Sequence, residues 1–375
     1  MPASTLTYAI RLQPSPTEAV LLERTCDAYL KACDKVSDWC HANECLTQRK
    51  VQDATYRTIR ETLGMPSQMA ISATRRVIGN YRTIKETTGR QWGKQPIRYT
   101  SPGYDLVWNR DYSVNRHGLV SVNTLEGRVK LHADWTHVPD EYRQGRYGTA
   151  RILQRNGKWL MLIPMTVTTP DPRRPQRVTG VDLGIRFLAT SYDGDGKTTF
   201  YKGKEVTHRR AEYKELRSEL QRKGTRSARK RLKSIGNREN RWMRDVNHQV
   251  SKALVNACDR PTLIVLEDLK GIRKTTEKVW KTQRYVQVSW AFFQLRQMIE
   301  YKAAKAGHTV LVIDPAYTSQ ACPKCGTILR TNRKKKQHLY VCANCGYTSN
   351  DDRVGAMNIQ RVGYQSLLES GVSIP

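Results

Sequence analysis

The chain has 375 residues, enough to bury one large hydrophobic core and to form more than one domain. Its 64 Lys and Arg outnumber 34 Asp and Glu, and the formal net charge of +30 predicts a polyanionic partner that relieves self-repulsion. Because basic residues are spread over most of the length, we expect a large nucleic acid. We expect no membrane span, since no apolar run approaches the ~20 residues of a spanning helix.

The nine cysteines, without an export signal before them, indicate a reducing intracellular setting, which we expect to be the cytoplasm of a prokaryote. Cys26, Cys33 and Cys40 recur every seven residues and therefore share one helix face. Core packing is favoured over metal binding there, because free cysteine is usually a small buried hydrophobe. His41 and Cys45 lie nearby, but no partner pair is in reach, so we expect no second zinc site.

The first 90 residues predict one strand followed by three helices. Apolar residues alternate over 6–12, which is typical of a strand, and a Pro-Ser-Pro break follows it. Thr17 is expected to cap the first helix. Two further helical segments follow at about 51–63 and 67–87.

Residues 91–167 have a different character, with Gly, Asn and Asp turns between short alternating runs. The pair Asn156-Gly157 between two apolar runs indicates a hairpin. We expect a small antiparallel β-barrel that includes the first strand, with the helical section 17–87 inserted between its strands. A Pro- and Arg-rich segment after Thr168 is expected to be a linker.

A second domain is predicted to open at Val178 with an α/β pattern. Its expected strands, in chain order, are 178–182, 187–191, 262–266 and 309–313, and its expected helices lie at 205–258, 288–306 and from about Asp352 to Val362. The helical segment 205–258 is strongly basic, and one sign of charge dominates it. This favours a nucleic-acid track over an ordinary solvated face.

Two Cys-x-x-Cys pairs stand sixteen residues apart, namely Cys322/Cys325 and Cys342/Cys345. Such a pair on a tight turn directs both thiolates to one tetrahedral Zn²⁺, and the spacing is that of a zinc ribbon. Two unrelated cysteine pairs are the alternative. A disulfide arrangement is disfavoured by the reducing setting.

Acidic residues are predicted to meet in the second domain. Asp182 and Glu267 each end a predicted strand, and Asp351 or Asp352 begins the final helix. Strand ends and a helix start can converge at one edge of an α/β sheet. Converging carboxylates repel one another unless divalent cations lie between them, and oxygen ligands suit Mg²⁺ or Mn²⁺.

Each acid alone has a simpler interpretation: Asp182 as a turn residue, Glu267 as a surface acid, Asp352 as a helix cap. Together with the ribbon and the charge of +30, the three acids favour an RNase H-like metal nuclease. Two Mg²⁺ about 4 Å apart activate a water and stabilise the leaving oxygen in phosphodiester cleavage.

Several short motifs carry a family resemblance by their identity and their order. They are Gly180-Val-Asp182-Leu-Gly184, Leu266-Glu267-Asp-Leu269, Thr318-Ser-Gln-x-Cys322-Pro-Lys-Cys325-Gly, Cys342-x-x-Cys345-Gly and Asp352-x-x-x-Ala356-x-Asn358-Ile359. In this order they resemble TnpB, the transposon-encoded, RNA-guided RuvC-like nuclease related to the type V CRISPR effectors. The resemblance covers most of the chain.

The resemblance implies that Asp182, Glu267 and Asp352 are catalytic acids that bind Mg²⁺ or Mn²⁺, and that Cys322, Cys325, Cys342 and Cys345 bind Zn²⁺. Asp352 is preferred over Asp351 because the family's acid precedes the motif alanine, here Ala356, by four positions. We therefore expect Asp351 to face away from the cluster and to tolerate replacement. The chain departs from the family at Val354-Gly355, where Asn-Ala is usual, so helix packing is expected to differ.

The implied fold class is a multidomain α+β and α/β protein. Its expected parts, in chain order, are a β-barrel wedge domain (1–14 and 91–170), a helical recognition domain (15–90), a linker (171–177), a RuvC/RNase H-like nuclease domain (178–316 and 351–375) and an inserted zinc ribbon that binds target nucleic acid (317–350). The Lys-rich stretch 270–286 matches a mobile lid of the family.

The implied function is RNA-guided cleavage of double-stranded target DNA beside a short adjacent motif, by a two-metal mechanism. The implied partners are the target DNA and a guide RNA derived from a transposon end, with one protein chain in the ribonucleoprotein. A catalytically silent RNA-guided DNA-binding repressor is one alternative, which the intact acids disfavour. A compact type V CRISPR effector with the same chemistry is another.

Overall fold

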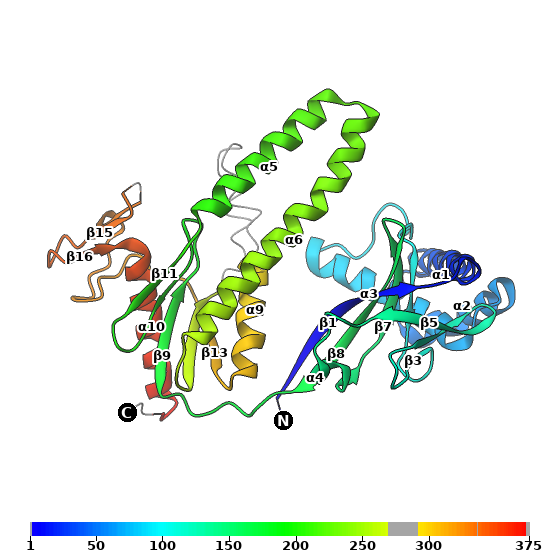
Figure 1. Cartoon of the computed structure of the whole chain (residues 1–375), viewed down its shortest axis with the longest axis horizontal. Helices are drawn as coiled ribbons and strands as arrows, with labels where there is room; N and C mark the ends of the chain where they lie inside the picture. The colour runs from blue at the N-terminus through cyan, green and yellow to red at the C-terminus, as the bar shows by residue number, and fades with distance from the viewer. Residues whose placement is uncertain (1, 269–291, 336, 373–375) are drawn as a thin grey trace. The chain divides into compact units, whose positions relative to one another are not determined.

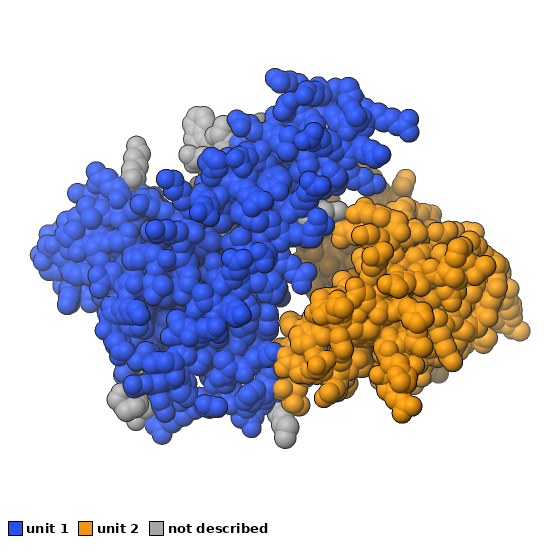
Figure 2. All heavy atoms as spheres, in the orientation of Figure 1, with its two compact units in different colours: residues 1–2, 169–375 blue, residues 3–168 orange. Residues whose placement is uncertain are grey.

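The computed structural model describes residues 2–268, 292–335 and 337–372 of the chain (Figure 1). They form two compact units, coloured separately in Figure 2. One unit comprises residues 3–168, and the other comprises residues 1–2 and 169–375. Among the described residues, no helix has the length and hydrophobicity needed to cross a membrane.

The unit of residues 3–168 is built on an eight-stranded antiparallel sheet in the order β2-β7-β8-β1-β5-β4-β3, with β6 paired to β8. The strands are β1 (Ala3–Gln13), β2 (Gly103–Leu106), β3 (Tyr112–Val114), β4 (Val120–Thr124), β5 (Gly127–Asp134), β6 (Arg146–Tyr147), β7 (Ala150–Arg155) and β8 (Lys158–Thr168). The edge strands β2 and β3 follow one another in sequence, and a Trp108–Tyr112 bridge lies between them. The sheet therefore nearly closes, which agrees with the predicted barrel and with the first strand as its member.

Turn chemistry sets the β7–β8 pairing. Asn156 (φ 53°) and Gly157 (φ 72°) both adopt the left-handed region between paired residues Arg155 and Lys158. Two consecutive left-handed residues match the twist of antiparallel strands, and Asn and Gly tolerate that conformation best. The hairpin predicted from this dipeptide is confirmed.

Three helices lie between β1 and β2 in the chain: α1 (Pro16–Ala42), α2 (Gln48–Leu63) and α3 (Ser67–Thr88); the single turn α4 (Asp140–Arg143) precedes β6. Their positions agree with the prediction, but the predicted cap was wrong. Ser15, not Thr17, caps α1, because its hydroxyl accepts from the Glu18 N–H while the Glu18 carboxylate accepts from the Ser15 N–H. Pro16 fits the first helical position, where no N–H is needed.

The cysteines of α1 face the hydrophobic core of this unit. Cys26, Cys33 and Cys40 are at most 1% exposed, and burial raises the pKa of each thiol to about 12. Neutral buried thiols pack as apolar groups. The interpretation as core residues is confirmed.

The second unit contains a five-stranded mixed sheet in the order β11-β10-β9-β12-β13. Its strands are β9 (Arg177–Asp182), β10 (Phe187–Tyr192), β11 (Thr198–Lys202), β12 (Thr262–Glu267) and β13 (Thr309–Ile313). The strands β9, β12 and β13 are parallel, whereas β10 is antiparallel to both neighbours. The carboxyl ends of β9 and β12 therefore lie at one edge of the sheet.

Helices cover both faces of this sheet: α5 (Lys204–Lys223), α6 (Arg226–Asn256), α9 (Phe292–Lys305) and α10 (Asp351–Glu369). Ile264 and Leu266 pack in one cluster with α6 and α9, whereas Val265 packs in another with α10. The helices α5 and α6 form a long hairpin arm (Figure 1), which turns at Gly224 (φ 61°). The start of the predicted helix 288–306 and the stretch 270–286 lie outside the described residues.

The final helix is longer than predicted, because α10 continues past Val362 to Glu369. Gly363 does not end it. A Cβ at Gly363 would lie 2.3 Å from Val265 Cγ2, so the glycine lets α10 approach the sheet closely. The ribbon before α10 contains the short helix η1 (Arg330–Asn332) and a three-stranded sheet of β14 (Arg333–Lys334), β15 (Leu339–Val341) and β16 (Thr348–Asn350).

Candidate carboxylate site and cysteine metal centre

Two of the predicted acids end neighbouring parallel strands. Val181 of β9 is paired in register with Leu266 of β12, and the next residues are Asp182 and Glu267. The two carboxyl groups therefore leave the sheet at the same edge. Both strands are buried on both faces, and a one-residue slip would exchange the residues that pack against α6 and α9 with those that pack against α10.

The helix α10 delivers Asp352 to the same edge. Its N-cap is Asn350, whose side-chain oxygen accepts from the N–H groups of Asp352 and Arg353. A Cβ at Gly180 would lie only 2.1 Å from the Ala356 carbonyl oxygen, so α10 rests directly on β9. A Cβ at Gly355 would lie 3.1 Å from Asp182 Oδ2, so this helix turn faces the Asp182 carboxylate.

The local electrostatics link the three acids. Burial, followed by repulsion from Glu267 and Asp352, raises the pKa of Asp182 well above its ordinary value. Burial also raises the pKa of Glu267, although a hydrogen bond from the Thr318 hydroxyl acts to lower it. Burial and the Asp351 carboxylate raise the pKa of Asp352. Groups of like charge that share a buried edge favour protonation or a bound cation.

In the described part of the chain, Asp182 and Glu267 do not belong to a group whose ligand atoms all lie within 4.8 Å of one another. Among the described residues, the acid-containing group that meets this criterion is His338, Asp351 and Asp352. The donor atoms of Asp182, Glu267 and Asp352 are all carboxylate oxygens, which suit Mg²⁺ or Mn²⁺.

Contrary to the expectation, Asp351 does not face away from Asp352, whereas the effect of replacing it stays a prediction. Its side chain is 1% exposed, and its Oδ2 lies 2.8 Å from Arg333 Nε while its Oδ1 lies 3.5 Å from His338 Nδ1. The Arg333 guanidinium also lies 3.6 Å from Asp352 Oδ1. Asp351 is thus a buried ion-pair partner, because the ribbon folds over the first turn of α10 and brings Arg333 there.

Sequence reasoning missed Arg333 and Thr318. Arg333 lowers the pKa of Asp182, Glu267 and Asp352, although burial has the larger effect on each. It stands in a basic run of the ribbon, and nothing in the sequence separates it from its neighbours. Thr318 is the first residue of a motif that carries the resemblance, but only the fold shows its hydrogen bond to Glu267.

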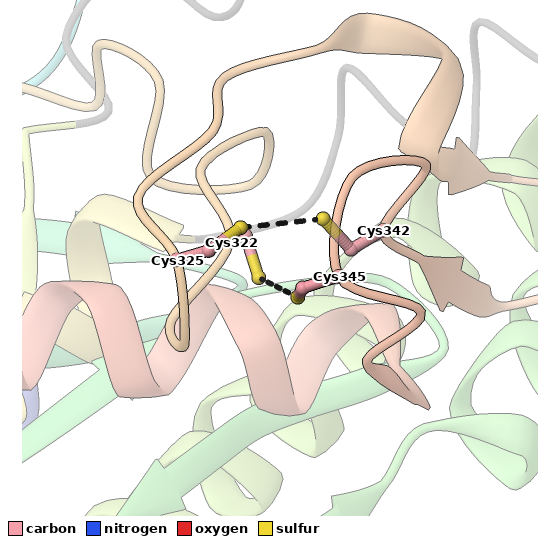
Figure 3. A group of neighbouring side chains, drawn as sticks. All are labelled: Cys322, Cys325, Cys342 and Cys345. Carbon is pink, nitrogen blue, oxygen red and sulfur yellow. Dashed lines mark hydrogen bonds between the residues drawn. The ribbon is translucent and has the colours of Figure 1, made fainter.

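The four ribbon cysteines converge as predicted (Figure 3). The sulfur atoms of Cys322 and Cys345 lie 3.6 Å apart, as do those of Cys325 and Cys342, and all four lie within 4.8 Å of one another. Tetrahedral Zn–S bonds of about 2.3 Å place sulfurs ~3.8 Å apart, whereas a disulfide needs about 2.05 Å. The cluster fits a structural zinc ribbon.

The ribbon core adjoins the carboxylate edge through α10. Val354, one of the two residues that depart from the family pattern, is fully buried and packs in one cluster with Cys322, Tyr340 and Cys342. Asp352 lies two residues before Val354 on the same helix. The side chain of Val354 thus connects the first turn of α10 to the hydrophobic core of the ribbon.

Two family models match the chain. Residues 162–273 match the OrfB/IS605 model, described as "Probable transposase", and residues 292–359 match the Cas12f1-like TNB domain. The CRISPR-associated endodeoxyribonuclease Cas12f1 of Syntrophomonas palmitatica is 26% identical over 81% of this chain and 62% of its own length. A TnpB-like protein of Methanocaldococcus jannaschii is 29% identical over 59% of this chain and 80% of its own length.

A solved structure supports the fold. The Cas12f1 chain in a complex with sgRNA and target DNA aligns with a TM-score of 0.65 and 13% identity, over 91% of this chain and 81% of that chain. The chain spans less than two thirds of the Syntrophomonas Cas12f1. By its two family models and these comparisons, the chain is similar both to TnpB-like proteins and to Cas12f1, which is related to the type V effectors.

Proposed function

We propose that this protein is an RNA-guided DNA endonuclease whose active site is formed by Asp182, Glu267 and Asp352. The observation that carries the proposal is the meeting of these carboxyl groups at one buried edge, with the pKa of each raised. A fold gains nothing from such repulsion alone. A bound pair of divalent cations would relieve it and supply the charge that phosphodiester hydrolysis needs.

The chain's own residues have distinct parts in this proposal. Asp182, Glu267 and Asp352 would hold Mg²⁺ or Mn²⁺, which activates a water and stabilises the leaving oxygen when bound. Thr318 donates a hydrogen bond to Glu267 Oε1 and so fixes the orientation of that carboxylate. Arg333, held by Asp351, places a positive charge where a phosphate would approach.

The cysteine centre has a structural part. Four thiolates around one Zn²⁺ leave no open coordination position for a substrate. The metal would instead hold the ribbon (317–350) together and thereby hold Arg333 and the start of α10. The ribbon is also proposed to contact target nucleic acid.

Guide RNA and target DNA are the proposed partners. The net charge of +30 exceeds what a short DNA contact needs, and the basic hairpin arm of α5 and α6 offers an extended track. We assign the barrel (1–14 and 91–170) and the helices (15–90) to the guide–target hybrid and to a short motif beside the target. One protein chain per guide, from a transposon end, completes the proposal.

Single replacements of the acids test the proposal. Asp182→Ala, Glu267→Ala and Asp352→Ala, each loaded with guide RNA, should lose cleavage of a matched plasmid and still bind it. Glu369→Ala, which removes an exposed acid at the far end of α10, is the matched control and should cleave normally. Normal cleavage by any of the three acid variants would contradict the assignment. Binding without cleavage by the unaltered protein would favour the repressor alternative.

A further inference from the structure

A short turn next to the carboxylate edge is fixed from two sides. The Thr318 hydroxyl donates to Glu267 Oε1 (2.5 Å), and it lies 3.1 Å from the Pro315 carbonyl oxygen. Asn358 of α10, which is 2% exposed, donates from its Nδ2 to the carbonyl oxygens of Thr318 (2.7 Å) and Ala321 (2.8 Å). The turn is thus tied to the strand that carries Glu267 and to the helix that carries Asp352.

The residue at the apex of this turn is Tyr317. Its φ is 63°, in the left-handed region that costs free energy for a residue with a bulky side chain. Its carbonyl oxygen accepts from the N–H groups of Gln320 and Ala321, which holds the backbone there. The residue is 60% exposed, so a large aromatic side chain faces solvent from a strained backbone.

The left-handed backbone and the exposed aromatic side chain of Tyr317 are both unfavourable for the protein without a ligand. Core packing does not explain a ring that is mostly exposed, and turn geometry alone would favour Gly or Asn at this φ. Strain and exposure in a turn fixed by neighbours are typical of a residue with a binding role. The adjacent residue touches Glu267, so this role lies at the carboxylate edge.

We propose that the Tyr317 ring stacks on an unpaired base of the DNA strand that is cut, and so positions the scissile phosphodiester at Asp182, Glu267 and Asp352. This inference rests on the proposed nuclease function. Every base has a flat π-face, which is accessible in a single strand and covered in a stacked duplex. Tyr317 is thus a substrate-positioning residue that favours single-stranded DNA without a preference for sequence.

Positive charge near Asp352 supports a nucleotide as the occupant. The Arg333 guanidinium lies 3.6 Å from Asp352 Oδ1, and the charges of Arg333 and Arg186 both act on that carboxyl, so a phosphate that reaches Asp352 meets positive charge. An aromatic platform next to cations is the usual arrangement for single-stranded nucleic acid. A protein segment docked on Tyr317 would give no dependence on bases.

The test measures stacking apart from cleavage. Asp182→Ala protein, loaded with guide RNA, is bound to target DNA that carries 2-aminopurine at successive positions of the cut strand. Stacking on Tyr317 should quench the fluorescence at one position near the cut. Adding Tyr317→Ala should restore that fluorescence, whereas Tyr317→Phe and Tyr317→Trp should keep the quench.

A second measurement uses protein with all three acids intact. It compares cleavage of a target that carries an abasic nucleotide at that position with cleavage of the unmodified target. Loss of the base should raise KM about 5- to 150-fold, the range of one stacking contact, with kcat changed little. Tyr317→Ala should raise KM equally and should be insensitive to the abasic change. The proposal would be overturned if the abasic nucleotide raised KM equally in the unaltered protein and in Tyr317→Ala. It would also be overturned if Tyr317→Ala left the 2-aminopurine fluorescence unchanged at every position.

Controls separate the stacking role from a folding role. Tyr317→Asn removes the ring but tolerates the left-handed backbone, so it keeps the turn if Tyr317→Ala does not fold. Its zinc content should equal that of the unaltered protein, and its melting temperature should be no lower, since Asn relieves the backbone strain at this φ. If the unaltered protein fails to cut guided targets, the nuclease proposal fails. If it cuts and the Tyr317 variants match it in all measurements, only the stacking proposal fails.

Discussion

Gly180 of β9 lies so close to Ala356 of α10 that an added Cβ would stand 2.1 Å from the Ala356 carbonyl oxygen. The strand that ends in Asp182 and the helix that begins near Asp352 therefore touch backbone to backbone. A side chain at position 180 would push the helix away. The distance between two of the proposed catalytic acids thus depends on a residue that has no side chain.

Gly180→Ala should lower the melting temperature and reduce cleavage, because the backbone of α10 has to move to admit the methyl group. Gly79→Ala is the control, since Gly79 lies in α3 with no atom within 4 Å of an added Cβ. It should stabilise the protein by about 0.5–1 kcal/mol and leave cleavage unchanged. Thermal melts and plasmid cleavage measure both. A Gly180→Ala protein with normal stability and activity would contradict this close packing.

Asp351 and Asp352 should differ in what their loss affects. Asp351→Ala leaves Arg333 without its buried ion-pair partner, which should cost up to about 3 kcal/mol of stability and weaken cleavage through the displaced guanidinium. Asp352→Ala should abolish cleavage at little cost in stability. Denaturant unfolding and cleavage rates of the two variants measure this. The opposite pattern would mean that the catalytic position in α10 is wrong by one residue.

Asp182→Asn should stabilise the metal-free protein at pH 8 while it abolishes cleavage. The folded-state pKa of Asp182 is raised above its ordinary value, so its ionisation costs stability as the pH rises through that raised pKa. The difference in melting temperature between variant and unaltered protein should therefore be a few degrees at pH 8 and vanish in acid, where the carboxyl is protonated in both states. Added Mg²⁺ should reduce the difference at pH 8. If metal-free Asp182→Asn protein melted at a lower temperature than the metal-free unaltered protein at pH 8, the proposed repulsion between Asp182 and the other acids would be refuted.

The purified protein should contain one Zn²⁺ per chain, bound by Cys322, Cys325, Cys342 and Cys345. Cys342→Ser should lose the zinc and most of the cleavage, because the ribbon holds Arg333 and packs against Val354 of α10. Cys45→Ser, outside the ribbon, should keep both. Elemental analysis and cleavage assays measure the outcome. Freshly purified, active protein without zinc would exclude this metal centre.

Local signals explain why much of the architecture could be predicted. The alternation in β1, the Asn156-Gly157 turn and the Cys-x-x-Cys spacing each depend on residues close in sequence, and the structure contains all three features. Short-range patterns were therefore sufficient for the nearly closed sheet and the cysteine cluster. The sequence also indicated that Asp182 and Glu267 end strands, but only the fold shows that these strands, β9 and β12, are parallel neighbours.

Features that depend on contacts between distant segments could not be predicted. Arg333 and Asp351 pair only because the ribbon folds over α10. Gly363 resembles a helix end in the sequence, but it serves close packing on Val265. In both cases the deciding partner is chosen by three-dimensional packing. The cap of α1 is different: Ser15-x-x-Glu18 is a local capping-box pattern that the sequence contains, and the prediction of Thr17 overlooked it.

The most direct test of the account compares RNA-free protein with protein loaded with its guide RNA, on one plasmid that carries the matched target and one that does not. The account predicts Mg²⁺-dependent cleavage of the matched plasmid by the loaded protein alone, and none by the loaded Asp182→Ala variant. Base pairing of the guide then supplies the sequence specificity, and the carboxylate edge supplies the chemistry. Equal, sequence-specific cleavage without RNA would contradict the account and leave a conventional basic nuclease.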